Sequence, residues 1–125
     1  MPSPLVYNAG SYTAPDADGR ERNVFASLCV THQLLAMGAA VVDSRASYHR
    51  LHGELPEQCF IDSGLALLGR CDALVVSGDW RSSKGTLAEM AEAKRLRLPC
   101  FNWTIPGERD ALRVWIEDYQ GSVVA

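Results

Sequence analysis

Basic residues are too few in this sequence to suggest a polyanionic partner. Lysine and arginine together number 12 against 15 aspartates and glutamates, for a formal net charge of -3, and proteins bind nucleic-acid polymers largely by neutralising phosphates with basic side chains. Long apolar runs are also missing, since none approaches the ~20 residues that a membrane-spanning helix needs. We therefore expect no nucleic-acid polymer and no membrane among the partners. The opening "MPSPLVYNAG" has neither a basic start nor a long apolar core, which predicts a cytoplasmic protein.

Motifs for several common site chemistries are absent. The four cysteines form no Cys-x-x-Cys pair, so we expect buried, reduced thiols rather than a zinc or thioredoxin-like site. Neither the Walker loop Gly-x-x-x-x-Gly-Lys-Ser/Thr nor the acyl-transfer motif Gly-x-Ser-x-Gly occurs. His49 and His52 have no third ligand at a recognisable spacing. We expect neither a metal ion nor a cofactor.

Short apolar runs alternate with helix-like segments along the chain. The runs are "PLVYNA", "AAVVDS", "DALVVSG" and "LPCFNW". They lack alternating polar residues, as strands do when helices cover both faces of a parallel sheet. The order predicts an α/β fold, with a single three-layer domain over residues 1–125. We expect a parallel sheet of four or five strands with flanking helices, flavodoxin-like and doubly wound.

Four helices are expected between and after these strands. The first should span about Arg20–Met37, ended by Gly38, because residues recur with helical spacing at Val24, Leu28, Thr31 or His32, and Leu35. The polar, glycine-containing segment 13–21 before it is expected to be a loop. The other three helices are expected at about Pro56–Gly69, after Gly85 and after Pro106.

Ligands of such sheets bind beyond the carboxyl ends of the strands, which selects four loops. These are "YNAGSYTAPD", "DSRASYHRLH", "SGDWRSSKGT" and "NWTIPG". Gly10 allows the backbone to turn sharply and to approach a ligand closely. Candidate ligand-contacting side chains in the first two loops are those of Tyr7, Ser11, Tyr12, Asp43 and His49. Tyr7 is equally compatible with a buried strand position.

The segment "SSKGTLAEMAEA" has two interpretations. Hydroxyl groups around Gly85 at a helix start would suit a phosphate or another anion. Alternatively, Ser83 or Thr86 is simply the N-cap, and Thr86-x-x-Glu89 has the capping-box spacing in which the glutamate binds an unpaired amide. Asp62 lies on the second predicted helix, where a single polar residue is common and usually structural. On spacing alone, the cap is the better interpretation of Glu89.

Three segments carry a resemblance to a known family. They are "LVYNAGSY", "CDALVVSGDW" and "RSSKGTLAEMAEA", and together they resemble the nucleoside 2-deoxyribosyltransferase-like superfamily, most closely its small bacterial members of unassigned function. The similarity spans most of residues 4–102. It implies cleavage or transfer of an N-glycosidic bond in a nucleoside or nucleoside 5′-monophosphate, with Glu89 as nucleophile and Tyr7 as its hydrogen-bonding partner.

The resemblance also implies roles around this pair. Ser83 stands where many active transferases have an aspartate that assists the leaving base, and Asp62 or Asp79 would have to replace it. Related nucleotide hydrolases suggest a phosphate cradle formed by Ser82, Ser83, Gly85 and Thr86. Trp80 and Tyr48 are candidates for stacking on the base, or else for core packing.

Loss of the family aspartate keeps a second function open. The same fold would then be a non-catalytic nucleotide-binding or sensor module. In either case the expected partner is a small-molecule nucleoside or nucleotide. The resemblance further implies a homo-oligomer, to which the apolar C-terminal "VVA" could contribute.

Overall fold

The computed structural model describes residues 2–124 of the chain, and side chains as far as Ser122. The "VVA" segment expected at an interface therefore lies outside the described side chains. Four strands form one parallel sheet in the order β2-β1-β3-β4. They are β1 (Leu5–Gly10), β2 (Ala40–Val42), β3 (Ala73–Ser77) and β4 (Cys100–Asn102). This confirms the predicted α/β class and the flavodoxin-like strand order.

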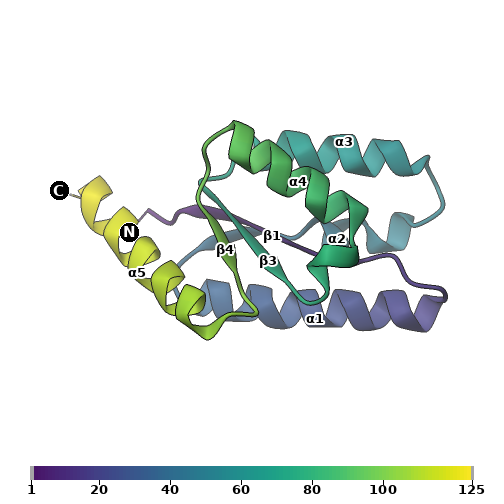
Figure 1. Ribbon diagram of the computed structural model, residues 1–125, viewed down its shortest axis with the longest axis horizontal. Helices are drawn as coiled ribbons and strands as arrows, with labels where there is room; N and C mark the ends of the chain where they lie inside the picture. The colour runs from purple at the N-terminus through teal and green to yellow at the C-terminus, as the bar shows by residue number, and fades with distance from the viewer. Residues whose placement is uncertain (1, 125) are drawn as a thin grey trace.

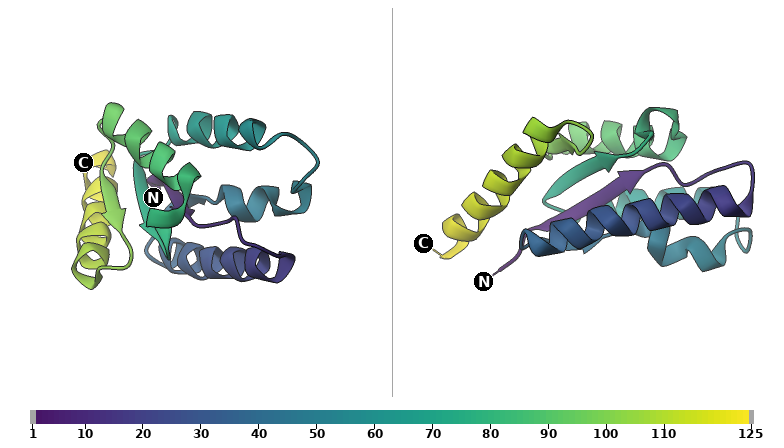
Figure 2. Two further views of the ribbon diagram at one scale, coloured as in Figure 1. Left: turned by 45° about the vertical axis from the view of Figure 1, so that its right-hand side comes forward. Right: turned by 90° about the horizontal axis from the view of Figure 1, so that it is seen from below.

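Helices cover both faces of the sheet (Figures 1 and 2). On one face, α1 (Ala17–Ala36) and α5 (Pro106–Val124) pack on the strands, and on the other α3 (Glu57–Leu68) and α4 (Lys84–Arg95) do so. Three short helical segments were not expected: α2 (Ser44–Tyr48) and the 3-10 turns η1 (His49–Leu51) and η2 (Trp80–Ser82). The start of β1 and the end of α5 lie away from the carboxyl edge of the sheet (Figure 1).

The strands β1 and β3 direct successive side chains to opposite faces, as the two-residue period of a strand requires. Val6 and Val75 belong to the apolar cluster beneath α1 and α5. Tyr7 and Leu74 belong to the cluster beneath α3 and α4. Tyr7 therefore faces the layer that contains α3 and α4.

Helix α1 begins earlier than predicted. Asp16 caps it by accepting a 2.7 Å hydrogen bond from the Gly19 amide, so the loop expected over 13–21 ends at Asp16. The predicted end is confirmed, because Gly38 follows the helix with φ of 100°, a backbone conformation that favours glycine.

The predicted apolar stripe of α1 was wrong at two of its positions. Val24 is buried, but Leu28 and Leu35 are 47% and 55% exposed. The cause lies in β1, where the buried Asn8 amide donates to the Ser27 carbonyl at 2.9 Å and to Thr31 Oγ1 at 3.0 Å. A buried amide needs hydrogen-bond partners, and the helix is turned so that its polar positions supply them.

The cysteines also differ from the expectation. All four are free, as predicted, but only Cys71 is buried, and the other three are exposed. Among the described residues, no helix has the length and the apolar composition needed to cross a membrane.

Candidate functional site

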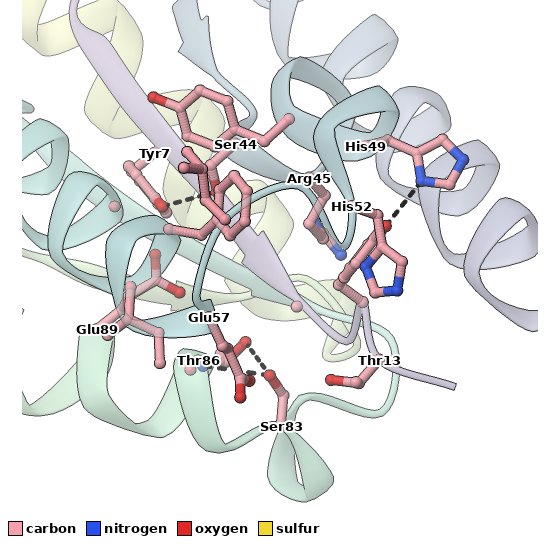
Figure 3. A pocket seen from close by; sticks show the side chains of 18 of the residues that line it. Tyr7, Thr13, Ser44, Arg45, His49, His52, Glu57, Ser83, Thr86 and Glu89 are labelled. Carbon is pink, nitrogen blue, oxygen red and sulfur yellow. Dashed lines mark hydrogen bonds between the residues drawn. The ribbon is translucent and has the colours of Figure 1, made fainter. Parts of the chain in front are cut away.

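A pocket of about 420 Å³ opens beyond the carboxyl ends of β1 and β2 (Figure 3). Its walls come from the loop after β1, the α2–η1 segment, helix α3 and the first turns of α4. The volume lies in the range of small-molecule sites. Nine of the sequence-predicted residues line it: Tyr7, Gly10, Tyr12, Tyr48, His49, Ser83, Gly85, Thr86 and Glu89.

Tyr7 and Glu89 meet at the base of this pocket. Tyr7 is fully buried, and its phenol shares a 2.9 Å hydrogen bond with Ser44 Oγ. Glu89 is half-buried on α4, with its carboxylate turned toward Tyr7 (Figure 3). Both side chains lie against Gly64 of α3, because a Cβ there would stand 2.9 Å from the Tyr7 hydroxyl and 3.3 Å from Glu89 Oε2. Three elements thus bring one phenol and one carboxylate together.

Burial shapes the protonation of this pair. It raises the pKa of Glu89 above its ordinary value, although Tyr7 and the positive charge of Arg45 favour the ionised carboxylate. Burial, followed by the negative charge of Glu89, raises the pKa of Tyr7 far above its ordinary value. The phenol therefore stays protonated and is available as a hydrogen-bond donor across the neutral pH range.

Arg45 is the main functional candidate that the sequence did not reveal. Its side chain is only 8% exposed, and one of its amino groups donates to Asn8 Oδ1 at 3.0 Å. Gly10 makes room for it, since a Cβ at that position would stand 2.5 Å from Arg45 Nη1. Burial lowers the pKa of Arg45, while the charges of Asp43 and Glu89 act in the opposite direction. A buried cation beside the pocket suits an anionic or strongly polar ligand.

The start of α4 confirms the predicted N-cap at Ser83 and tests the capping-box interpretation of Glu89. Ser83 is the N-cap, and its Oγ accepts hydrogen bonds from the Thr86 amide at 3.2 Å and from Thr86 Oγ1 at 2.9 Å. Thr86 is thus inside the helix, and the capping-box interpretation of Thr86-x-x-Glu89 is wrong. Glu89 lies six residues after the cap and lines the pocket, so it is not a capping residue.

A second polar group lies at the rim of the pocket. His49 Nδ1 is 2.8 Å from the Tyr12 hydroxyl, and His49 Nε2 is 2.7 Å from Glu21 Oε1. The rings of Tyr12 and His49 meet edge to face with centroids 5.7 Å apart. Burial raises the pKa of Tyr12. This carboxylate–imidazole–phenol chain joins α1, η1 and the loop after β1.

The aspartates considered for the site do not line the pocket. Asp62 is exposed on α3 and accepts a hydrogen bond from Gln58. Asp79 is exposed and accepts one from Ser82 Oγ at 2.7 Å. Asp43 is buried beneath α2, where it caps the helix through the Ala46 amide at 3.2 Å. The geometry therefore offers neither Asp62 nor Asp79 as a partner of Glu89.

Three other predicted residues also lie outside the pocket lining. Ser11 and Ser82 both donate to the Asp79 carbonyl, at 2.6 and 2.9 Å, and so organise the loop around η2. Trp80 packs against the core cluster beneath α3 and α4, with the Arg81 guanidinium 4.2 Å from its ring centroid. For Trp80, base stacking and core packing were both considered, and the structure shows core packing. Tyr48 does line the pocket, with its hydroxyl 2.8 Å from Ser63 Oγ.

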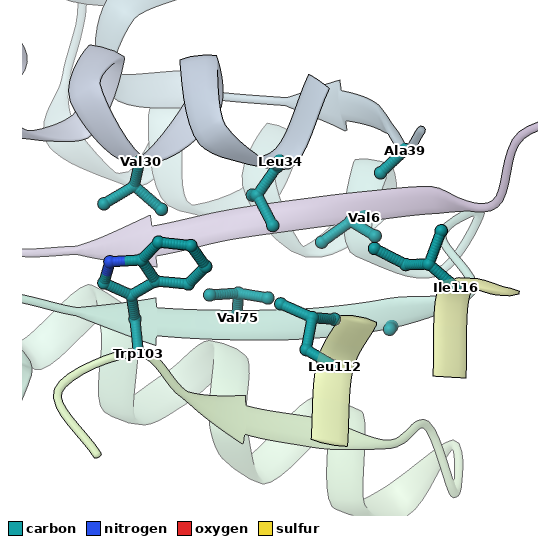
Figure 4. Close-up of a cluster of buried hydrophobic side chains, with 9 residues drawn as sticks. Val6, Val30, Leu34, Ala39, Val75, Trp103, Leu112 and Ile116 are labelled. Carbon is teal, nitrogen blue, oxygen red and sulfur yellow. The ribbon is translucent and has the colours of Figure 1, made fainter. Parts of the chain in front are cut away.

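The loop after β4, "NWTIPG", was the fourth loop selected from the sequence, and none of its residues lines the pocket. Trp103 follows β4, but its ring is buried among Val30 of α1 and Val75 of β3 (Figure 4). Because α5 returns to the α1 face of the sheet, this loop is drawn into the core on the side opposite Glu89.

Sequence reasoning missed Ser44, Arg45 and Gly64. Arg45 lies in the loop "DSRASYHRLH" that the sequence selected. Its side chain points inward because of Asn8 and Gly10, which belong to β1. Gly64 had one available signal, since a glycine inside a helix is unfavourable and usually has a packing reason. Within residues 2–124, no cluster of three or more histidine, cysteine, aspartate or glutamate side chains is arranged to hold a metal ion.

The fold and the site define an α/β domain with a pocket at the carboxyl edge of a parallel sheet. The family model described as a domain of unknown function (DUF4406) matches residues 5–102, and the chain belongs to this family. The match runs from the start of β1 to the end of β4, so it includes every pocket residue named above. A search among curated proteins gives no match. The resemblance to nucleoside 2-deoxyribosyltransferases stays a prediction.

Proposed function

We propose that this protein cleaves or transfers the N-glycosidic bond of a nucleoside or nucleoside 5′-monophosphate, with Glu89 as nucleophile. The observation that carries the proposal is the placement of the Glu89 carboxylate beside the buried Tyr7 phenol at the base of a pocket. A helix-surface glutamate with only a structural role has no need of such a site. Perturbed ionisable groups in a pocket mark candidate catalytic residues.

The chemistry follows from the charge that develops on the sugar. Loss of the base gives the anomeric carbon oxocarbenium character, which a carboxylate stabilises before it forms the covalent bond. Tyr7, itself fixed by Ser44, directs the carboxylate. The positive charge of Arg45 favours the ionised form of the Glu89 carboxylate. Water or a second base then takes the sugar from Glu89, which gives hydrolysis or transfer.

The start of α4 supports a 5′-phosphate as part of the substrate. Ser83, Gly85 and Thr86 line the pocket there, and the first N–H groups of a helix have no partner in its own hydrogen-bond ladder. Nothing lies within 4 Å of a Cβ added at Gly85, so the backbone is open to an approaching group.

A non-catalytic nucleotide-binding module is the alternative. One observation favours it. Neither Asp62 nor Asp79 lines the pocket to replace the aspartate of the active deoxyribosyltransferases. In this case the pocket would hold a nucleotide without turning it over.

One assay separates the two functions. The purified protein is incubated with a panel of nucleosides and their monophosphates, and the free base is followed by chromatography. We expect base release that falls at least about a thousandfold in Glu89→Gln, because the nucleophile is lost.

Glu92→Gln is the matched control, since Glu92 lies on the same helix outside the pocket lining and pairs with Arg95. It should retain activity. If no base is released and a nucleotide still raises the melting temperature, the enzyme proposal fails and the binding module remains.

The homo-oligomer also stays a prediction. Helix α1 offers a surface for it, because Phe25, Leu28 and Leu35 are exposed on one side of that helix.

A further inference from the structure

We propose that His49, acting through the Tyr12 hydroxyl, delivers the proton that the departing base needs. This inference rests on the proposed glycosidic function. Many deoxyribosyltransferases use an aspartate, at the position of Ser83, to assist the leaving base, and we assign that role to His49 and Tyr12 on a different wall of the pocket.

The geometry is that of a proton relay. Tyr12 and His49 both line the pocket that holds Glu89, and the imidazole is held at both nitrogens, 2.8 Å from Tyr12 and 2.7 Å from Glu21. The side chain of His49 is 19% exposed and that of Glu21 67% exposed, so the relay runs from solvent to the pocket. A carboxylate that orients a histidine, which in turn contacts a hydroxyl, is a recurring arrangement for proton transfer.

Protonated His49 fits these contacts. Both ring nitrogens then donate, Nε2–H to the Glu21 carboxylate and Nδ1–H to the Tyr12 oxygen. The hydrogen of the Tyr12 phenol is left free to point into the pocket. Glu21 is a positioning residue in this scheme, because it acts through the imidazole.

The step balances as follows. A Glu89 oxygen forms a bond to the anomeric carbon while the bond from that carbon to the base nitrogen breaks. The electron pair of the broken bond stays on the base, whose ring takes the Tyr12 proton as His49 passes its own to Tyr12. In hydrolysis, water then attacks the anomeric carbon, the Glu89–carbon bond breaks with its electron pair returning to the carboxylate, and the water proton restores His49 through Tyr12.

Other ionisable groups at the pocket fit the role less well. Glu57 lines it, but this side chain is exposed in the first turn of α3 and is not part of the hydrogen-bonded chain of Tyr12, His49 and Glu21. His52 also lines the pocket, and its ring is tilted against that of Tyr12 with centroids 5.7 Å apart. No hydrogen bond orients its ring within the described part of the chain. The control is His32, which is exposed on α1 and lies outside the pocket lining.

The test compares two leaving groups in the same variant. A purine nucleoside 5′-monophosphate loses its base only with a proton, whereas nicotinamide mononucleotide carries a cationic pyridinium that leaves as neutral nicotinamide without one. We expect His49→Gln and Tyr12→Phe to lower kcat on the purine nucleotide about a hundredfold or more, and to change kcat on nicotinamide mononucleotide little. His32→Gln should leave both rates near the wild-type value, and Glu89→Gln should abolish both.

Each other outcome is decisive. Equal losses on both substrates in His49→Gln would assign the residue a structural role and overturn the inference. Unchanged rates on both would do the same. Wild-type cleavage of nicotinamide mononucleotide alone would show that no proton donor operates, although the glutamate chemistry would stand. Absence of cleavage on both substrates by the wild-type protein would be a failure of the proposed function itself.

Discussion

At the scale of single residues, Gly64 determines how closely the two reactive side chains approach each other. It lies inside α3, where a glycine destabilises the helix by up to about 1 kcal/mol relative to alanine. Its hydrogen faces the Tyr7 hydroxyl and Glu89 Oε2. The helix thus gives up local stability where the pocket needs space.

Gly64→Ala should damage the site without unfolding the domain. The new methyl group would stand 2.9 Å from the Tyr7 hydroxyl, and Tyr7 is fully buried and has no free direction in which to move. Because small displacements of reacting groups have large effects on rate, we expect kcat/KM to fall roughly tenfold to a hundredfold, measured by base release. Gly69→Ala is the matched control, since its methyl group would meet nothing closer than 3.4 Å. Full activity of Gly64→Ala would contradict the close approach of Tyr7 and Glu89.

At the scale of elements, helix α4 combines a cap and a ligand site in one turn. Ser83 caps the helix and also lines the pocket. Removing its hydroxyl in Ser83→Ala leaves the Thr86 amide and hydroxyl without their acceptor. We expect the free energy of unfolding, measured by urea titration, to fall by about 0.5–2 kcal/mol.

Ser83→Asp separates the two roles of this residue. Aspartate caps a helix as well as serine does, so stability should be kept. A negative charge in the pocket wall should at the same time weaken binding of a nucleoside 5′-monophosphate relative to the free nucleoside. A ratio of the two affinities that is the same in Ser83→Asp as in the wild-type protein would place the phosphate elsewhere.

The secondary-structure elements also show which parts of the structure can be predicted from the sequence. The four strands and helices α3, α4 and α5 could be predicted, because apolar runs and glycine or proline signals are local in the chain. The orientation of α1 could not, since it depends on the hydrogen bonds of Asn8 in another element. Arg45 and Gly64 escaped for the same reason, as the side chains that give them a role are distant in sequence.

At the scale of the whole molecule, the buried carboxyl of Glu89 makes stability depend on pH. Burial raises its pKa in the folded protein, so the folded state holds this proton more tightly than the unfolded chain does. The stabilisation that results is complete below the ordinary glutamate pKa of about 4.3 and is lost as the pH rises through the raised pKa. At neutral pH the ionised Glu89 therefore lowers stability.

Glu89→Gln should accordingly be more stable than the wild-type protein at pH 7. The advantage should shrink at pH 4, where Glu89 is mainly protonated in both states, and urea unfolding at the two pH values measures it. Glu92→Gln should behave in the opposite way, because Arg95 lowers the pKa of Glu92. A Glu89→Gln variant that is less stable at pH 7 would show that the carboxylate has a structural partner.

The central claim is that Glu89 forms a covalent bond to the sugar, and trapping that intermediate tests it most directly. A 2-fluoro sugar analogue of the substrate slows the release of the sugar, because fluorine destabilises the oxocarbenium-like transition state. Intact-protein mass spectrometry should then show one added fluorosugar on the wild-type protein and on Glu92→Gln, but none on Glu89→Gln. An adduct that persists in Glu89→Gln, or that maps to another side chain, would contradict the account.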